Sequence, residues 1–438
     1  MKNAVLFAGS MCFYFSGTVN NPEHFILLLA SIAVDFSAGI LMSKFENRKK
    51  MILTAGILFH LTSIFVYKYS GFLLGEISSH LGTASPAFDP VMPIGISFYT
   101  FQGISYLADV YRGKVKAEES LLGFGVYISM FEQLIAGPIV TYDCVAEKLH
   151  HREIKKNAAI MGLAIFIIGL GLKVLLANPV GKLWTDVKAI GFESISTPLA
   201  WMSLAAFSFQ IYFDFFGYSL MAVGLGKMVG FDLPENFRLP YVSRSMTEFW
   251  RRWHITLGSW FREYVYIPLG GNRLGRIGTV RNLLAVWLLT GIWHGAGYNF
   301  ILWGMTLFLI IASEKYLTGS FLARNFLASR VYMIILIPLT WAVFAIEDMD
   351  KLAVFFSRLF PFFGDGVWSV FRYDYLKYLK MYWPFLIICL VMSAILPQNI
   401  LKHVRNRLLL WTILAAILAA CIYCMYRGLD DPFLYFRF

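Results

Sequence analysis

Two tryptophan–histidine pairs lie in neighbouring stretches of the chain, TEFWRRWHITLGSWFREYVYIPLGGNR (Thr247–Arg273) and TGIWHGAGYNFILWG (Thr290–Gly304). An arginine-rich segment separates His254 from His294, and most of the remaining sequence is apolar. Of the 438 residues, 58% are hydrophobic and only 15% are charged, whereas a soluble domain carries about 25% charged residues. Ionisable residues are costly in such an apolar chain, so they usually face a cavity and serve a function.

Apolar runs recur along the whole chain at about the 20 residues that a helix needs to cross a ~30 Å hydrocarbon core. The sequence therefore predicts an all-α, polytopic membrane protein with about 10–11 transmembrane helices plus re-entrant and interfacial helices. No internal repeat or low-complexity linker divides it, so we expect a single membrane-embedded domain over residues 1–438. The predicted segments are 4–17, 24–43, 51–69, 91–111, 121–141, 158–177, 198–225, 281–312, 331–347, 381–396 and 408–426.

Basic residues in the loops predict the orientation of these segments, because cytoplasmic loops are enriched in lysine and arginine. Residues 226–281 carry nine of them, which assigns this signature region to the cytoplasmic side. Segment 121–141 has basic residues on both flanks and contains Glu132 and Gly137-Pro138, which favours a re-entrant hairpin inside the protein. Topology and anionic lipid headgroups account for the net charge of +11, so nucleic acid is not an expected partner.

The N-terminus and the cysteines add little chemistry. The first 17 residues have no bounded cleavage site and predict a short first helix rather than a cleaved signal peptide. The five cysteines lie mostly in apolar segments, which indicates packing rather than a disulfide framework. We predict no metal site.

The residues around His254 follow helical periodicity. Trp250, His254, Leu257 and Phe261 have the spacing of one helix face, which points the histidine toward the apolar interior. A hydrogen-bonded structural histidine and a catalytic histidine both fit this pattern.

His294 is predicted to lie deep in the membrane. If its helix, 281–312, begins near Arg281, the histidine lies roughly 20 Å along the axis of a span that crosses a ~30 Å core. Gly291, Gly295 and Gly297 leave backbone space around it for a ligand or for a neighbouring helix. Interhelical hydrogen bonding and a functional role both remain open.

Four further polar residues lie in predicted spans or beside the second histidine: Gln102, Gln210, Asp214 and Asn299. Hydrogen bonding between helices would explain them. A polar tunnel for a chain-like substrate would also explain them, because aromatic residues surround Gln102, Gln210 and Asp214.

The chain resembles the membrane-bound O-acyltransferase family, in its bacterial alginate and peptidoglycan O-acetylation branch. The resemblance spans residues 93 to 438 in the order of the family's motifs. It rests on the two stretches quoted first and on PIGISFYTFQGISYLADVYRG (Pro93–Gly113), GPIV (Gly137–Val140), FSFQIYFDFFGYSLMAVGLGKMVGFDLPENFRLPY (Phe207–Tyr241) and FLYFRF (Phe433–Phe438). It implies a helical fold with a central tunnel in the bacterial plasma membrane, and it maps the family's two motif histidines to His294 and His254.

These implied roles define the expected chemistry. His294 is the expected general base for acyl transfer, and His254 is expected to orient the donor or to polarise its carbonyl. Acetyl-CoA or a carrier thioester is the expected donor substrate, with no cofactor bound. The expected ligands of its phosphates are Arg251, Arg252, Arg262 and Arg273, although anchoring to lipid headgroups explains each arginine equally well.

Acceptor and partner follow from the same resemblance. Tyr435 in the aromatic tail could carry the acyl group as a relay, or it could belong to an interfacial aromatic belt. The branch implies a polysaccharide acceptor and an SGNH-type extracytoplasmic partner enzyme. Leu220 replaces an acidic residue usual in the branch, and the first apolar stretch is shorter than usual. The alternatives are a teichoic-acid D-alanyl transferase, a transporter, and an inactive scaffold of a polysaccharide-modification complex.

Overall fold

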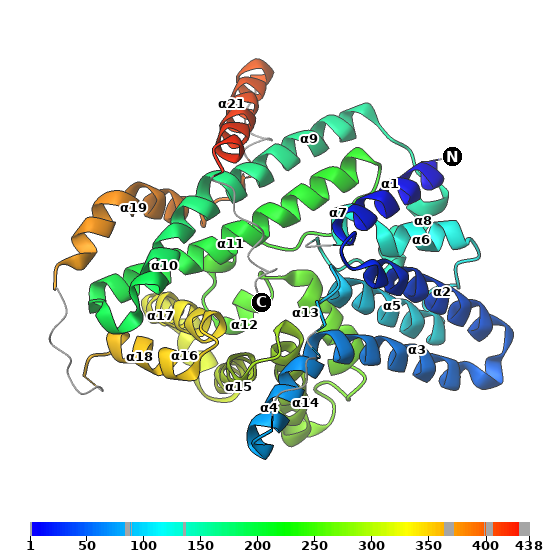
Figure 1. The fold of residues 1–438 in the computed structure, drawn as a ribbon, viewed down its shortest axis with the longest axis horizontal. Helices are drawn as coiled ribbons and strands as arrows, with labels where there is room; N and C mark the ends of the chain where they lie inside the picture. Colours follow the sequence, from blue (N-terminus) through cyan, green and yellow to red (C-terminus); the bar gives the residue numbers. More distant parts are fainter. Residues whose placement is uncertain are drawn as a thin grey trace. The chain divides into compact units, whose positions relative to one another are not determined.

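A computed structural model describes residues 2–83, 88, 90–134, 137–362, 372–397, 399 and 406–428 (Figure 1). Within these ranges the regular elements are all helices, which confirms the all-α prediction. Eight of the described helices are long and apolar enough to cross a membrane, judged by length and composition. They span Pro22–Lys44, Glu46–Leu81, Lys156–Ile190, Thr197–Met228, Tyr298–Arg324, Phe326–Ala345, Asp374–Met392 and Arg407–Tyr426.

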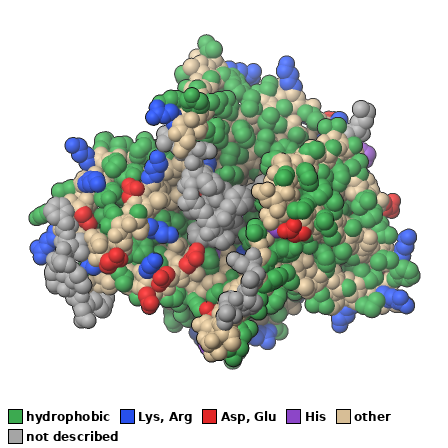
Figure 2. All heavy atoms as spheres, viewed as in Figure 1, with side chains coloured by type: hydrophobic (Ala, Val, Ile, Leu, Met, Phe, Trp, Pro, Cys, Tyr) green, Lys and Arg blue, Asp and Glu red, His purple; other side chains and the backbone are tan. Residues whose placement is uncertain are grey.

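Apolar side chains are exposed over much of the face shown in Figure 2, as expected for a protein that faces lipid. The helix Phe326–Ala345 illustrates this, because its apolar residues point outward as well as inward. Leu327 is 75% exposed and Ile334 is 70% exposed, whereas Trp341 on the same helix is buried. A helix that is apolar on all faces is typical of a membrane span.

The chain forms two compact units, each continuous in space but not in sequence. Unit 1 contains residues 1–163, 222–234 and 259–268, and unit 2 contains residues 164–221, 235–258 and 269–438. The signature region therefore contributes to both units, since residues 235–258 belong to unit 2 and residues 259–268 to unit 1.

Unit 1 packs its helices around a core of leucine, isoleucine, tyrosine and phenylalanine side chains. Its element 121–141 is broken, because α6 ends at Ser129 and α7 begins at Phe131, with Met130 in a non-helical conformation between them. The entry and exit of this element on one membrane face stay a prediction. The helices that lie wholly in this unit are α1 (Lys2–Gly17), α2 (Pro22–Lys44), η1 (Glu46–Arg48), α3 (Lys49–Ile64), η2 (Phe65–Tyr69), α4 (Ser70–Leu81), α5 (Ile96–Tyr111), α6 (Leu121–Ser129), α7 (Phe131–Leu134), α8 (Tyr142–His150) and η6 (Arg262–Tyr266).

Unit 2 contains the rest of the described helices. Three helices, α9 (Lys156–Gly171), α11 (Thr197–Met228) and α13 (Ile255–Phe261), contribute residues to both units. The others are η3 (Leu172–Ala177), α10 (Asn178–Ile190), η4 (Phe192–Ser194), η5 (Pro240–Val242), α12 (Met246–Trp250), α14 (Gly275–His294), α15 (Tyr298–Ser313), η7 (Glu314–Thr318), α16 (Gly319–Arg324), α17 (Phe326–Ala345), α18 (Met349–Leu359), α19 (Asp374–Met392) and α21 (Arg407–Tyr426).

Close helix packing in unit 2 depends on glycines. Gly169 of α9 lies against Gly217 of α11, and a Cβ on either residue would meet the backbone oxygen of the other. These two helices run side by side (Figure 1). Gly291 of α14 packs in the same way on the Phe300 carbonyl of α15. Small residues let membrane helices approach closely, so this face of α14 holds a neighbouring helix.

The predicted helix 281–312 is two helices. The first, α14, begins at Gly275 and ends at His294, and α15 begins only at Tyr298. Gly295 and Gly297 between them have extended backbone, and glycine is a poor helix former. His294 is therefore the last residue of its helix rather than a residue near the middle of a longer one.

Candidate functional site

His254 lies between two short helices and not within one. Helix α12 ends at Trp250, α13 begins at Ile255, and His254 has a φ of 44° in the left-handed region, where residues other than glycine are uncommon. The predicted continuous helix face through Trp250, His254, Leu257 and Phe261 is therefore wrong.

Tertiary hydrogen bonds explain this break. The backbone N–H of Ile255 donates to the carbonyl of Asn236 at 3.0 Å, and the N–H of Arg238 donates to the carbonyl of Arg252 at 2.8 Å. Asn236 and Arg238 thus hydrogen-bond to the backbone N–H of Ile255 and the carbonyl of Arg252, which a continuous helix would have paired within itself. Strained backbone of this kind persists only where surrounding structure fixes it, and such positions cluster at functional sites.

The His254 imidazole is enclosed by one amide and two aromatic rings. Its Nδ1 lies 3.1 Å from Asn236 Oδ1, and its ring centroid lies 4.7 Å from that of Phe215 and 6.3 Å from that of Trp293. These three side chains carry no charge. Burial lowers the pKa of His254 from 6.5 to about 3, so the ring is neutral at physiological pH.

His294 also lies beside Trp293. Its ring is 4.9 Å from the Trp293 ring, 5.0 Å from Trp303 and 5.2 Å from Phe344, and the residue is 7% exposed. One indole therefore contacts both imidazoles. The structure brings together the two histidines that the sequence places 40 residues apart.

An aromatic cluster surrounds this pair within unit 2. Trp250 packs on Trp303 at 5.5 Å, and Trp253 packs on Trp341 at 4.9 Å. Asn299 is buried, and its Nδ2 donates to the carbonyl of Phe344 at 3.0 Å. This predicted tunnel residue thus helps to position the backbone of an aromatic residue that contacts His294.

A buried carboxylate holds the start of α12. The oxygens of Glu314 accept hydrogen bonds from the backbone N–H of Met246 (2.5 Å), from the N–H (2.8 Å) and hydroxyl (2.6 Å) of Thr247, and from the Tyr332 hydroxyl (3.0 Å). Helix N-termini leave N–H groups without partners inside the helix, and a carboxylate satisfies them well. Sequence reasoning missed Glu314 because it lies 67 residues from Thr247.

Replacing Glu314 with alanine is expected to lower the free energy of unfolding by about 3 kcal/mol, since it removes charge-assisted hydrogen bonds and leaves buried N–H groups unsatisfied. Thermal unfolding in detergent micelles measures this loss. Glu347→Ala, at an exposed carboxylate of the same unit, is the matched control and should unfold like the wild type. Equal unfolding midpoints for the two variants would contradict the role given to Glu314.

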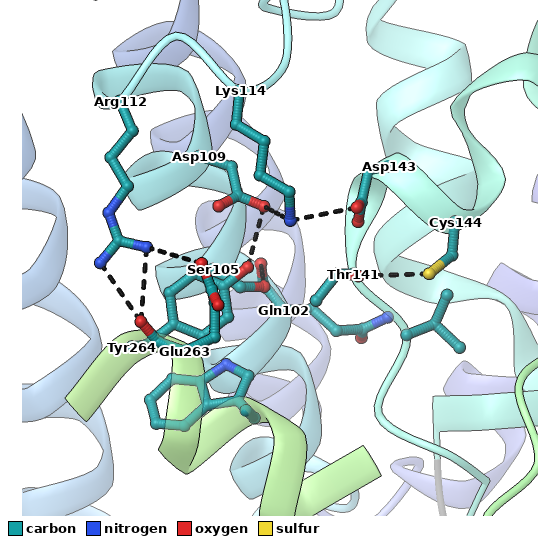
Figure 3. A network of polar contacts seen from close by, with 12 residues as sticks. Gln102, Ser105, Asp109, Arg112, Lys114, Thr141, Asp143, Cys144, Glu263 and Tyr264 are labelled. Carbon is teal, nitrogen blue, oxygen red and sulfur yellow. Dashed lines mark hydrogen bonds and ion pairs between the residues drawn. The ribbon is translucent and has the colours of Figure 1, made fainter. Parts of the chain in front are cut away.

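The part of the signature region in unit 1 has its own anchor (Figure 3). The Trp260 ring stacks on Phe101 at 3.8 Å, and its Nε1 donates to the Phe101 carbonyl at 2.9 Å. The Tyr264 hydroxyl donates to Asp109 at 2.8 Å. Lys114 pairs with the same Asp109 carboxylate at 3.2 Å and with Asp143 at 3.0 Å. This network fixes residues 259–268 on α5 and α8.

The other predicted tunnel residues have helix partners. In unit 1, Gln102 donates to the Tyr127 carbonyl at 3.5 Å. In unit 2, the side-chain amide of Gln210 lies so close to Gly181 that a Cβ at position 181 would overlap it. Asp214 of the same unit forms a buried ion pair with Lys173. Lys173 was not predicted as a site residue. The polar tunnel stays a prediction, because these contacts are those of packed helices.

None of the four predicted donor-binding arginines is buried. Arg251, Arg262 and Arg273 are exposed, and Arg252 pairs with Glu248 at 2.7 Å. Arg262 belongs to unit 1 and the other three to unit 2. Leu220, the departure from the family pattern, is buried in α11. Tyr435 lies outside the described residues.

Comparison with known proteins shows the family to which the chain belongs. The sequence profile described as the membrane-bound O-acyltransferase family matches residues 117–347, which include both histidines. The probable alginate O-acetylase of Pseudomonas aeruginosa is 36% identical over 379 residues, covering 84% of this chain and 71% of that protein. The peptidoglycan O-acetyltransferase of Helicobacter pylori is 31% identical over 365 residues, covering 76% of this chain and 69% of that protein. The teichoic acid D-alanyltransferase of Bacillus subtilis is 26% identical over 280 residues, covering 61% of this chain and 69% of that protein.

Proposed function

Because this chain belongs to the membrane-bound O-acyltransferase family, we propose that it is a membrane O-acetyltransferase of the bacterial plasma membrane. It takes an acetyl group from a cytoplasmic thioester, acetyl-CoA, and moves it toward hydroxyl groups of an extracytoplasmic polysaccharide. The relatives whose names state O-acetylation of alginate or peptidoglycan support this substrate class. The observation that carries the proposal is the pair of buried histidines that share one indole in unit 2.

His294 is the general base in this proposal. As the hydroxyl oxygen attacks the thioester carbonyl, its proton passes to the imidazole. The carbonyl carbon–sulfur bond then breaks, and the imidazolium returns the proton to the departing sulfur, which leaves as the thiol of coenzyme A. His294 ends α14, and the carbonyl end of a helix carries partial negative charge that stabilises a cation formed there. The aromatic rings of Trp293, Trp303 and Phe344 fix the imidazole and limit its access to water.

His254 acts on the donor, either by orienting the thioester arm or by polarising its carbonyl. The exposed side chains of Arg251 and Arg273 are available to phosphates of coenzyme A on the cytoplasmic side. In this proposal an SGNH-type partner completes the transfer to the polymer, and Tyr435 carries the acyl group between the two proteins. Mass analysis of the C-terminal peptide during turnover tests the carrier role, and absence of an added acetyl group would exclude it.

The similarity to a teichoic acid D-alanyltransferase supports a second candidate, D-alanyl transfer from a carrier-protein thioester. The full chain, reconstituted in proteoliposomes, separates the two when it is supplied with labelled acetyl-CoA or with labelled D-alanyl carrier. We expect transfer of the labelled acetyl group from acetyl-CoA and no transfer of the labelled D-alanyl group from its carrier. Transfer from the D-alanyl carrier alone would favour the second candidate, and substrate flux without acyl transfer would indicate a transporter. The acetylated polymer that is lost when the chain is deleted from cells would identify the acceptor.

A further inference from the structure

The side-chain amide of Asn236 contacts three groups of the segment that carries His254. Its Oδ1 lies 3.1 Å from His254 Nδ1, 3.3 Å from the backbone nitrogen of Thr256 and 2.9 Å from the Thr256 hydroxyl. Asn236 is 2% exposed and His254 is 1% exposed, so water does not compete for these bonds. The backbone carbonyl of the same asparagine also accepts a hydrogen bond from the backbone N–H of Ile255.

The orientation of this amide follows from its partners. A backbone N–H can only donate, so the amide atom that faces Thr256 must be the oxygen. The amide nitrogen then points to Ser219, and Nδ2 donates to the Ser219 hydroxyl at 3.1 Å. Since Oδ1 has no hydrogen to give, Nδ1 of His254 must be the donor in the bond between them.

We propose that Asn236 is a positioning residue that fixes His254 in the Nδ1–H tautomer and presents its Nε2 lone pair to the substrate. A neutral imidazole carries one N–H, so a hydrogen on Nδ1 leaves Nε2 without one. Nε2 is buried and has no hydrogen-bond partner among the described residues. The atom is therefore available to a hydrogen-bond donor that arrives with the substrate.

This tautomer limits the roles that His254 can have in acyl transfer. The role given to His254 rests on the proposed function, whereas the tautomer itself does not. A lone pair repels a developing oxyanion, so neutral His254 does not polarise the thioester carbonyl. It accepts a hydrogen bond from an N–H or O–H group. The amide N–H groups of a pantetheine arm and the acceptor hydroxyl both have this chemistry. Of the two roles expected for His254, orientation of a substrate is the one that this tautomer permits.

Nitrogen NMR tests the tautomer independently of activity. The full chain is labelled with ¹³C,¹⁵N-histidine in lipid nanodiscs, and the His254 signals are assigned by difference from His254→Gln. We expect a protonated Nδ1 and a bare Nε2 in the wild type, and a mixture of tautomers in Asn236→Leu. A protonated Nε2 in the wild type would overturn the inference.

Activity as a function of pH then separates positioning from mere structural support. Asn236→Asp keeps an acceptor for Nδ1–H and adds a negative charge, which favours the protonated ring and raises the pKa of His254. The acid limb of acetyl transfer should therefore move to higher pH in this variant. Asn236→Leu should lose about 10²-fold in rate across the pH range. Asn325→Leu, at an exposed asparagine whose Nδ2 donates to the Phe321 carbonyl, should keep wild-type activity and is the matched control.

Equal losses in Asn236→Asp and Asn236→Leu, with an unchanged pH profile in each, would overturn the positioning role. Failure of the proposed function gives a different pattern. A wild-type chain that shows the Nδ1–H tautomer but transfers no acetyl group would remove the acyltransfer proposal and leave the tautomer assignment intact.

Discussion

Replacing His294 with alanine is expected to lower acetyl transfer about 10²–10⁴-fold, the contribution of a well-placed general base. The loss should fall mainly on kcat, because the proton is taken only as the hydroxyl attacks the thioester. The side chain is 7% exposed and contacts aromatic rings, so the variant should still fold, with a small cavity beside Trp303. Transfer of labelled acetyl groups in membranes, normalised to the amount of inserted protein, measures the effect.

His80→Ala is the matched control for this experiment. His80 lies exposed near the end of α4, where its Nδ1 contacts the Glu76 carbonyl, and its loss should leave transfer unchanged. His294→Gln adds a second comparison, since glutamine keeps polarity at the site but cannot act as a base near neutral pH. Wild-type rates in His294→Ala would exclude the histidine as the base and move the search to His254.

The largest effect on stability is expected at the ion pair of Lys173 and Asp214. Both side chains are buried, at 7% and 2% exposure, and they lie on membrane-spanning helices. Removing one member leaves an uncompensated charge in a medium of low dielectric constant, which typically costs about 3–5 kcal/mol. Lys173→Met alone or Asp214→Leu alone should therefore unfold much more easily in detergent than the wild type. The double variant should recover most of the loss, because neither charge is then buried.

The exposed pair of Lys227 and Asp232, at 3.0 Å, provides the comparison. A solvent-exposed ion pair contributes about 0–1 kcal/mol, so Lys227→Met should change unfolding little. Equal effects of Lys173→Met and Lys227→Met would show that the buried pair does not stabilise unit 2. If the double variant stays as unstable as the single variants, then Lys173 or Asp214 has a further role in stability besides their ion pair.

Much of the fold could be predicted from the sequence, because the length of an apolar run can be read from one segment without knowledge of the rest of the chain. A run such as Thr197–Met228 must form a helix in lipid wherever it lies, since its backbone can be satisfied only internally. Short elements were harder to predict. The break at Gly295–Gly297 could have been anticipated from its glycines, but the break at His254 could not, because it depends on backbone bonds to Asn236 and Arg238.

The site divides in the same way. His254 and His294 are chemically distinctive residues in an apolar chain, so composition and motif were enough to select them. The residues that bond to distant segments were not visible, because Asn236 contacts His254, Glu314 contacts Thr247 and Lys173 contacts Asp214 across separations of 18, 67 and 41 residues that have no periodicity. A residue that functions by supplying one hydrogen bond or one charge to a distant segment leaves no local pattern.

By itself, the sequence determined that this protein is a helical membrane enzyme of a recognisable family, and it selected two histidines as candidates for the site. Only the tertiary structure decided that one indole lies against both imidazoles, that α14 ends at His294, and that the Asn236 side chain lies against Nδ1 of His254. The physical reason is the range of the forces involved. Burial in lipid selects helices from the composition of a single segment, whereas a tautomer or an ion pair is selected by whichever atom a second segment brings within about 3 Å.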